Sequence, residues 1–152
     1  MMRSSVMERI MQKIALAMVL AGLVLAGCFP QEAPERPTKY TSIEGALANA
    51  QDVRVLYLPK AGITDLPAGL AGLSNLEKLD LRGTGLAALP PAAGALQKLA
   101  FLDLGENKLT DLPAEFSGLV SLHTLYLDLN GLAALPAALC SLPGLKYLNM
   151  DR

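Results

Sequence analysis

Two carboxylates, Asp80 and Asp103, stand 23 residues apart in similar sequence surroundings. Paired carboxylates can divide acid and base roles in hydrolysis, but only where a pocket shifts the pKa of one of them. The apolar segments around them predict neighbouring strands on an open face, where no such pocket is expected. Three interpretations compete: solvated charge beside Lys78 and Arg82, which is the simplest, a surface for a basic partner, and a catalytic pair.

Other motifs that could carry chemistry are weak. Gly83-Thr84-Gly85 superficially matches the glycine fingerprint of a dinucleotide site. The internal repeat explains it, and Pro90 and Pro91 prevent the long helix that a phosphate site needs. The chain has no zinc-type Cys/His cluster, no phosphate loop and no nucleophile elbow. We therefore predict no catalytic residue, no metal site and no cofactor.

Two single residues have plain interpretations. His123, the one histidine, stands beside a predicted strand and is expected on the surface. Cys140 follows Leu139 in a return segment and is expected to be a small apolar filler. An intermolecular disulfide is the alternative for Cys140.

Cys28 closes an N-terminal segment with the features of an export signal. Arg3, Arg9 and Lys13 supply positive charge, and residues 14–27 form an uncharged apolar run. That run is shorter than the roughly 20 residues of a membrane-spanning helix. A basic start, a short apolar run and small residues are typical of a secretory signal peptide. Met7 is an alternative start that keeps this pattern.

The segment Leu25-Ala26-Gly27-Cys28 resembles the lipobox of bacterial lipoproteins. The resemblance implies cleavage before Cys28 and attachment of diacylglycerol to its sulfur, a reaction that requires a thiol. Two or three acyl chains would hold the exported protein firmly at a membrane. Phe29, where Asp signals inner-membrane retention, favours the outer membrane if the cell is Gram-negative. The alternative is an ordinary signal peptide with an incidental Cys28.

A 23-residue repeat runs through residues 53–152. Its first positions are apolar: Val53, Leu76, Leu99, Leu122 and Leu145. The pattern is L-x-x-L-x-L-x-x-N-x-L-x-x-L-P-x-x-L-x-x-L. Leu-x-Leu places alternate residues on one face of a strand, and Leu-Pro-x-x-Leu has helical spacing with Pro in the first turn. Such units cannot bury their apolar faces alone, but stacked they form one continuous core.

This pattern resembles the leucine-rich repeats of the 23-residue, Leu-Pro type, over four full repeats and a partial fifth. The resemblance implies an α/β solenoid, with a parallel sheet on the concave face and short helical or irregular return segments. It also implies that Asn at the ninth repeat position hydrogen-bonds the turn backbone. Asn107 and Asn130 fit, whereas Ala61 and Thr84 occupy this position in the first two repeats. We expect those two turns to be held less tightly.

The N-terminal end of the array is expected to carry a helical cap. Thr41 and Glu44 fit a capping box, and apolar residues at helical spacing predict a short helix over residues 42–50. The domain prediction is therefore a signal peptide (1–27), a lipidated Cys with a Pro-rich tether (28–38), a capping helix (39–52) and leucine-rich repeats (53–152).

The C-terminal end shows no cap in the sequence. Leu145, Leu148 and Met150 would be half covered on the last strand. An open strand edge is a template for pairing, which raises a homodimer through this edge as an alternative. A truncated gene is the other interpretation.

The outward side chains of the strands form three columns on the predicted concave face. The central column holds Tyr57, Asp80, Asp103, Tyr126 and Asn149. The flanking columns hold Val55, Lys78, Phe101, Thr124 and Tyr147 on one side, and Pro59, Arg82, Gly105, Asp128 and Asp151 on the other. Exposed aromatics in a concave array suit peptide or sugar binding. The predicted ligand contacts are Tyr57, Asp80, Arg82, Phe101, Asp103, Tyr126, Asp128, Tyr147 and Asn149.

Length and charge narrow the function class. The 152 residues suggest one domain, and a net charge of -1 argues against a nucleic-acid binder. The leading prediction is a membrane-anchored module that binds a protein or peptide partner. The alternative is a structural or self-associating envelope protein that uses its C-terminal edge. An enzyme is least favoured, because no residues are left over for a catalytic domain.

Overall fold

The computed structural model describes residues 39–151. The predicted signal peptide, Cys28 and the tether up to residue 38 lie outside the described residues, as does Arg152. Predictions about them stay predictions.

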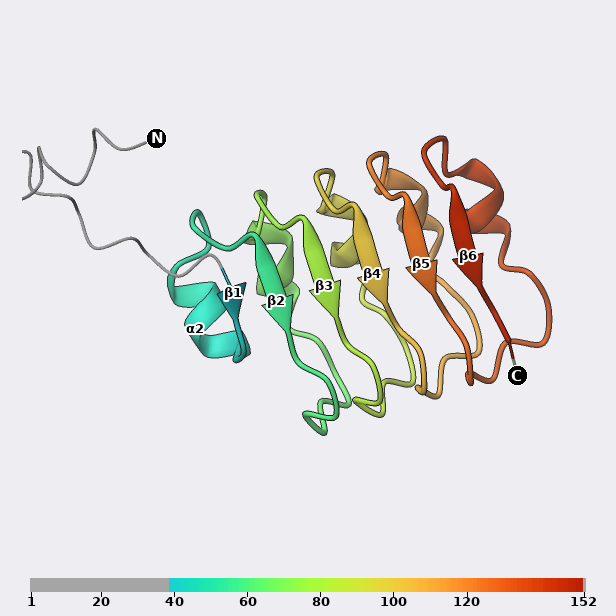
Figure 1. Ribbon diagram of the computed structural model, residues 1–152, viewed down its shortest axis with the longest axis horizontal. Coiled ribbons are helices and arrows are strands. Elements are labelled where there is room, and N and C mark those ends of the chain that lie inside the picture. The colour runs from blue at the N-terminus through green and yellow to red at the C-terminus, as the bar shows by residue number, and fades with distance from the viewer. Residues whose placement is uncertain (1–38, 152) are drawn as a thin grey trace, which may run out of the picture. The chain divides into compact units, whose positions relative to one another are not determined.

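Six short strands form one parallel sheet whose order follows the chain (Figure 1). They are β1 (Lys39–Tyr40), β2 (Val55–Tyr57), β3 (Lys78–Asp80), β4 (Phe101–Asp103), β5 (Thr124–Tyr126) and β6 (Tyr147–Asn149). From β2 to β6 each strand pairs with the next in a constant register, so Leu56, Leu79 and Leu102 align in one column. The predicted leucine-rich-repeat solenoid is confirmed.

Short 3-10 helices return the chain behind the sheet (Figure 1). They are η1 (Ala68–Gly72), η2 (Pro91–Ala95), η3 (Ala114–Gly118) and η4 (Ala137–Ser141). Each follows a proline in extended conformation: Pro67, Pro90, Pro113 and Pro136. The repeat proline thus stands at the N-cap, one residue before the predicted first turn. A fixed φ near −65° suits the entry to a helix.

Leucine side chains fill the space between the sheet and the return segments. Leu76 and Leu104 have no exposed surface, and Leu102 retains only 2%. Burial of one such side chain contributes about 1.5–3 kcal/mol to the free energy that favours folding. Phe116 replaces the return-segment leucine in one repeat and is also fully buried, whereas the equivalent residue one repeat earlier is the small Ala93. This dense core gives the outer face of the sheet a rigid base.

The hydrogen-bonded ladder continues beyond each three-residue strand. Leu81 N donates to Asp103 O at 2.8 Å, and Gly83 N donates to Gly105 O at 2.9 Å. The residue that ends this extension is left-handed in every full repeat: Lys60, Gly83, Glu106 and Leu129 have φ of 54, 64, 55 and 53°. Such a φ favours glycine, and three of the four repeats impose it on another residue.

The N-terminal end differs in detail from the prediction. Helix α2 spans Ile43–Ala48, and its N-cap is Ser42, whose Oγ accepts a hydrogen bond from Gly45 N at 3.2 Å. The prediction of Thr41 as the N-cap was therefore wrong, because the N-cap lies one residue later, at Ser42. Strand β1 was not predicted. It lies inside the segment 39–52 that was assigned to the capping helix, and it pairs with β2. Like every helix between residues 39 and 151, α2 lacks the length and the apolar run needed to cross a bilayer.

Candidate functional site

The predicted columns are present on the outer face of the sheet. Val55, Lys78, Phe101, Thr124 and Tyr147 are successive partners in the ladder, and so are Tyr57, Asp80, Asp103, Tyr126 and Asn149. We call this surface, together with the two residues after each strand, the open face. It brings the nine predicted contact residues together on β2 to β6 and the segments that follow them.

Three aromatic rings form a continuous strip on the C-terminal half of the open face. The Phe101 and Tyr126 ring centroids lie 5.8 Å apart, and those of Tyr126 and Tyr147 lie 5.3 Å apart, with tilts of 49° and 48°. Tilted pairs at this spacing attract each other. Tyr147 is 48% exposed, and the other two rings are half-buried. We call these residues the aromatic row. Its mutual packing fixes the rings before any partner arrives.

The other exposed aromatic of the open face, Tyr57, lies at the opposite end. Its ring is 42% exposed, and Lys39 Nζ lies 4.7 Å from the ring centroid. A cation at this distance is attracted by the ring. Lys39 belongs to the unpredicted strand β1, so the repeat pattern could not predict a basic neighbour for this tyrosine.

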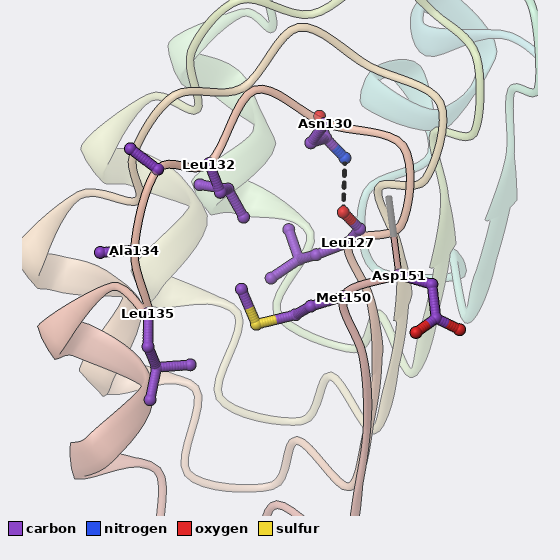
Figure 2. Close-up of a pocket in the computed structure, with 8 residues that line it drawn as sticks. Leu127, Asn130, Leu132, Ala134, Leu135, Met150 and Asp151 are labelled. Atoms are coloured by element: carbon purple, nitrogen blue, oxygen red, sulfur yellow. Dashed lines mark hydrogen bonds between the residues drawn. The ribbon is translucent and has the colours of Figure 1, made fainter.

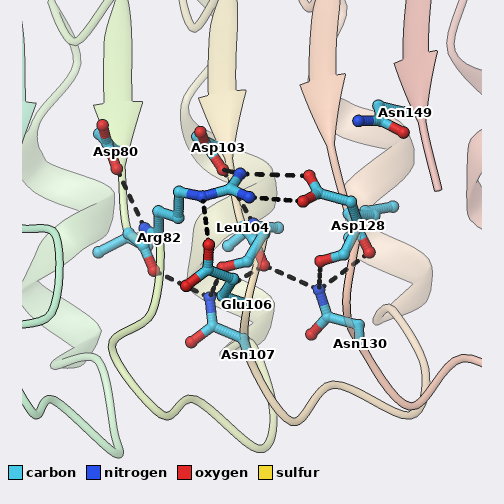
Figure 3. A network of polar contacts seen from close by, with 12 residues as sticks. Asp80, Arg82, Asp103, Leu104, Glu106, Asn107, Asp128, Asn130 and Asn149 are labelled. Atoms are coloured by element: carbon cyan, nitrogen blue, oxygen red, sulfur yellow. Dashed lines mark hydrogen bonds and ion pairs between the residues drawn. The ribbon is translucent and has the colours of Figure 1, made fainter. Parts of the chain in front are cut away.

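Arg82 is the centre of an ion-pair network (Figure 3). Its Nη2 lies 2.5 Å from Asp128 Oδ2, its Nη1 lies 3.2 Å from Asp128 Oδ1, and its Nε lies 3.1 Å from Glu106 Oε1. Its contact with Asp103 Oδ1 is the longest, at 3.4 Å. The hydrogen bond with Asp128 is the main reason why the pKa of Arg82 is raised. Arg82 and Asp128 were both predicted to contact a ligand, but they bind each other across two repeat boundaries.

Gly105 makes this crossing possible. It stands on the repeat between Arg82 and Asp128 and is buried under the pair. A Cβ at this position would lie 2.9 Å from Arg82 Cζ and 2.9 Å from Asp128 Oδ1, which is closer than van der Waals contact allows. A side chain at position 105 would therefore require the ends of the Arg82 and Asp128 side chains to shift.

The carboxylates of the central column also hold the backbone. Asp80 Oδ1 accepts a hydrogen bond from Arg82 N at 3.0 Å, and Asp103 Oδ1 accepts one from Gly105 N at 2.9 Å. Asn149 Oδ1 plays the same part for Asp151 N at 3.1 Å. These contacts are turns in which a side chain bonds the N–H two residues later. The side chain of Asp103 is only 13% exposed, so solvated charge is the wrong description for it.

Asp103 carries an unfavourable electrostatic balance. Burial is the largest cause and raises its pKa above the ordinary 3.8; the Asp80 and Asp128 charges act in the same direction. The Gly105 N–H and Arg82 lower the pKa but do not cancel the increase. The negative charge on this side chain is therefore only partly compensated within the protein.

The expected asparagine contacts are present in the turns. Asn107 Oδ1 accepts from Gly85 N and Leu86 N, and its Nδ2 donates to Leu81 O at 2.8 Å, so it joins two repeats. Asn130 Oδ1 accepts from Leu109 N at 3.0 Å. Thr84 Oγ1 reaches Leu81 O at 3.0 Å, as a partial substitute. The side chain of Ala61 has no polar atom that could make such a contact, and the weaker first turn stays a prediction.

The left-handed residues form an exposed edge beside the open face that the sequence analysis missed. Lys60, Glu106 and Leu129 are exposed, Leu129 at 53%. The sequence signal was Gly83, a glycine at the same repeat position. A glycine at this position is typical of a left-handed backbone, and the same positive φ is found at the equivalent residue of every full repeat.

Two single-residue predictions have opposite outcomes. His123 is exposed, as expected. Cys140 is exposed with a free thiol, so its assignment as a buried filler was wrong. Leu139 takes the core position of η4, and its neighbour consequently points outward. Among the described residues, no group of three His, Cys, Asp or Glu side chains could hold a metal ion.

A hollow of about 200 Å³ lies at the C-terminal end of the array (Figure 2). Leu127, Leu132, Leu135 and Met150 line it, and the Met150 side chain extends into it. Leu135 is 55% exposed, and Leu148 on β6 is 37% exposed. Apolar side chains that are buried in the inner repeats are thus accessible here.

Comparison with known proteins gives a consistent result. A family model described as leucine rich repeat matches residues 74–132. A leucine-rich-repeat protein of Leptospira interrogans is 31% identical, with a TM-score of 0.57 over 76% of this chain. An internalin of Listeria monocytogenes is 27% identical, with a TM-score of 0.61 over 72% of this chain. The chain spans 36% and 31% of these two structures. No curated protein matches the chain significantly.

Proposed function

Because the chain is a leucine-rich-repeat protein, we propose that it is a binding module that captures a protein or peptide partner on its open face. The aromatic row is the observation that carries this proposal. Three mutually packed rings, one of them nearly half exposed, offer apolar area on a rigid sheet. Aromatic side chains are enriched at protein interfaces, and rings that are already fixed lose little entropy on binding. We assign the module no catalytic reaction.

Capture on living cells tests this function. Cross-linking followed by mass spectrometry would compare the wild-type chain with a variant carrying Tyr57→Ala, Asp80→Asn, Asp103→Asn and Tyr126→Ala. Asn is chosen at the two acidic positions because Asn149 makes the same backbone contact. A control variant carries Gln97→Ala and Glu115→Ala, two exposed residues of the return side.

We expect a partner that the wild type and the control capture and the open-face variant does not. Unchanged capture by the open-face variant, with its thermal stability intact, would contradict the proposed function.

We further propose that the module is an exported lipoprotein held at a membrane through Cys28. The support is the basic start, the short apolar run and the Leu25-Ala26-Gly27-Cys28 segment. The outer membrane is the proposed location in a Gram-negative cell. Metabolic labelling with a fatty acid should mark the wild type and leave the Cys28→Ser variant unlabelled. Label on that variant would exclude the anchor, and Cys140→Ser is the matched control.

Self-association through the C-terminal edge is a second candidate. It is favoured by the exposed Leu135, which lines the hollow of Figure 2, by the exposed Leu148 on β6, and by the position of β6 at an edge of the sheet. Light scattering over a range of concentrations separates the two functions. A mass that rises with concentration, and no longer does so in Leu148→Lys, would support this candidate. A constant monomer mass would exclude it.

A further inference from the structure

The aromatic row borders the ion-pair network. Asp103 is the register partner of Tyr126, and it lies two residues after Phe101 on the same face of β4. The pKa of Tyr126 is raised mainly by burial, then by the neighbouring Tyr147, and to a smaller extent by the charges of Asp103 and Asp128. An apolar ring surface and a carboxylate are therefore presented side by side.

The network has more negative than positive charge. Asp103, Glu106 and Asp128 form ion pairs with the single guanidinium of Arg82, so three negative charges oppose one positive charge and leave an excess of two. On the neighbouring strand β3, the charges of Asp80 and Lys78 balance each other. Lys60, whose chain passes over Gly83, lowers this excess by one at most. A positively charged group is the complement of this surface.

Asp103 keeps one carboxylate oxygen available. Both of its hydrogen bonds, from Gly105 N and from Arg82 Nη1, end on Oδ1. Within residues 39–151 no hydrogen bond reaches its Oδ2. Arg82 makes its two-pronged contact with Asp128 and only a long contact with Asp103. The positive charge of Arg82 thus mainly compensates Asp128 and not Asp103.

We propose that the aromatic row docks an extended peptide segment carrying an arginine, whose guanidinium lies on the Tyr126 ring and binds Asp103 Oδ2. Arginine fits better than lysine because its planar group stacks on a ring and pairs with a carboxylate at the same time, and because it is less strongly hydrated. The neighbouring rings of Phe101 and Tyr147 take an apolar side chain of the same segment. This inference rests on the proposed function and specifies the partner of that face.

Three blocked peptides test the inference with the purified full chain in detergent. The first is acetyl-Ser-Gly-Arg-Leu-Gly-Ser-amide; in the others citrulline or lysine replaces arginine. Citrulline has nearly the same shape as arginine and no charge. Dissociation constants are measured from the NMR shifts of the tyrosine ring signals. We expect the arginine peptide to bind at least about five times more tightly than the citrulline peptide, and more tightly than the lysine peptide.

Two matched variants locate the effect. Asp103→Asn keeps the bond to Gly105 N and removes the charge. Asp111→Asn keeps the bond that Leu112 N donates to this side chain and removes an exposed charge outside the open face. Asp103→Asn should abolish the preference for arginine over citrulline, and Asp111→Asn should keep it. Tyr126→Leu should abolish the preference for arginine over lysine. Thermal melting of each variant verifies folding.

Equal binding of the arginine and citrulline peptides by the wild type would overturn the inference. An equal effect of Asp111→Asn and Asp103→Asn would overturn it as well, because the loss of any negative charge would then have the same effect. These results are independent of partner capture on cells. If capture on cells depends on the open face but the arginine and citrulline peptides bind equally, the proposed function stands. Only the inference that the partner carries an arginine is then excluded.

Discussion

At the scale of single residues, Gly105 shows how a missing side chain organises charges. A Cβ at this position would lie 2.9 Å from Arg82 Cζ and 2.9 Å from Asp128 Oδ1, so the ends of these two side chains would have to shift. The Asp128 side chain is 10% exposed and that of Arg82 is 31% exposed, so water compensates the loss of this pair only in part. A partly buried ion pair that is broken leaves an uncompensated charge, and this costs more than the pair contributes when formed.

Gly105→Ala should therefore lower the free energy of unfolding by about 2 kcal/mol, between the values for exposed and buried pairs. Urea unfolding followed by circular dichroism measures it. Gly72→Ala is the control, since its Cβ would meet no atom within 4 Å. If the two variants lose equal stability, the cost at position 105 comes from the backbone and not from the ion pair.

Asp103 provides a pH-dependent prediction. Its pKa is raised in the folded protein, mainly by burial, so its ionised form favours the unfolded chain. The corresponding stability is present below the ordinary pKa of 3.8 and is lost as the pH rises through the folded-state pKa. Asp103→Asn should thus melt at a higher temperature than the wild type at neutral pH, and the difference should shrink as the pH falls toward 3.8. A difference that is constant with pH would show that the charge is not its origin.

At the scale of the elements, the turns depend on the buried Asn107 and the half-buried Asn130. Asn107 is 7% exposed and bonds backbone groups of two repeats. Thr84, at the same position one repeat earlier, has two acceptors within reach of its single hydroxyl proton, Leu81 O and Asn107 Oδ1, each at 3.0 Å. A ladder of this kind couples each turn to its neighbour, because one amide satisfies donors and acceptors on both sides.

Asn107→Ala should lower the free energy of unfolding by about 3 kcal/mol, since several buried backbone groups lose their partners. Thr84→Ala should cost about 1 kcal/mol, because it removes one hydroxyl. Urea unfolding of both variants against the wild type gives the comparison. Equal losses would contradict the greater role assigned to the asparagine.

At the scale of the whole described array, stability should fall toward the C-terminal end. A repeat is held by its neighbours alone, and exposure rises from 2% at Leu102 on β4 to 37% at Leu148 on β6. Leu104 N and Leu127 N make equivalent hydrogen bonds, to Tyr126 O at 2.9 Å and to Asn149 O at 2.7 Å. Their amides differ mainly in the strand that supplies the acceptor.

Native-state hydrogen exchange should therefore be at least about tenfold faster at Leu127 N than at Leu104 N, because β6 opens locally more often than β5. The two amides form a matched pair within one molecule. Equal protection would mean that the described array opens as a single unit and that its last strand is as stable as its inner strands.

The 23-residue spacing determined the repeat, the strand positions, the columns of the open face and the leucine core. Each follows from local periodicity repeated without change, since identical units stack in identical register. The asparagine contacts and the exposure of His123 were predictable for the same reason.

Other features arose only when the repeats stacked. The pairing of Arg82 with Asp128, the backbone contacts of Asp80 and Asp103 and the cation beside Tyr57 join residues whose distance the pattern does not encode. Periodicity assigns each side chain to a column. Which neighbour a long charged side chain reaches depends on the space between the columns. At Gly105 this space is open because glycine has no Cβ.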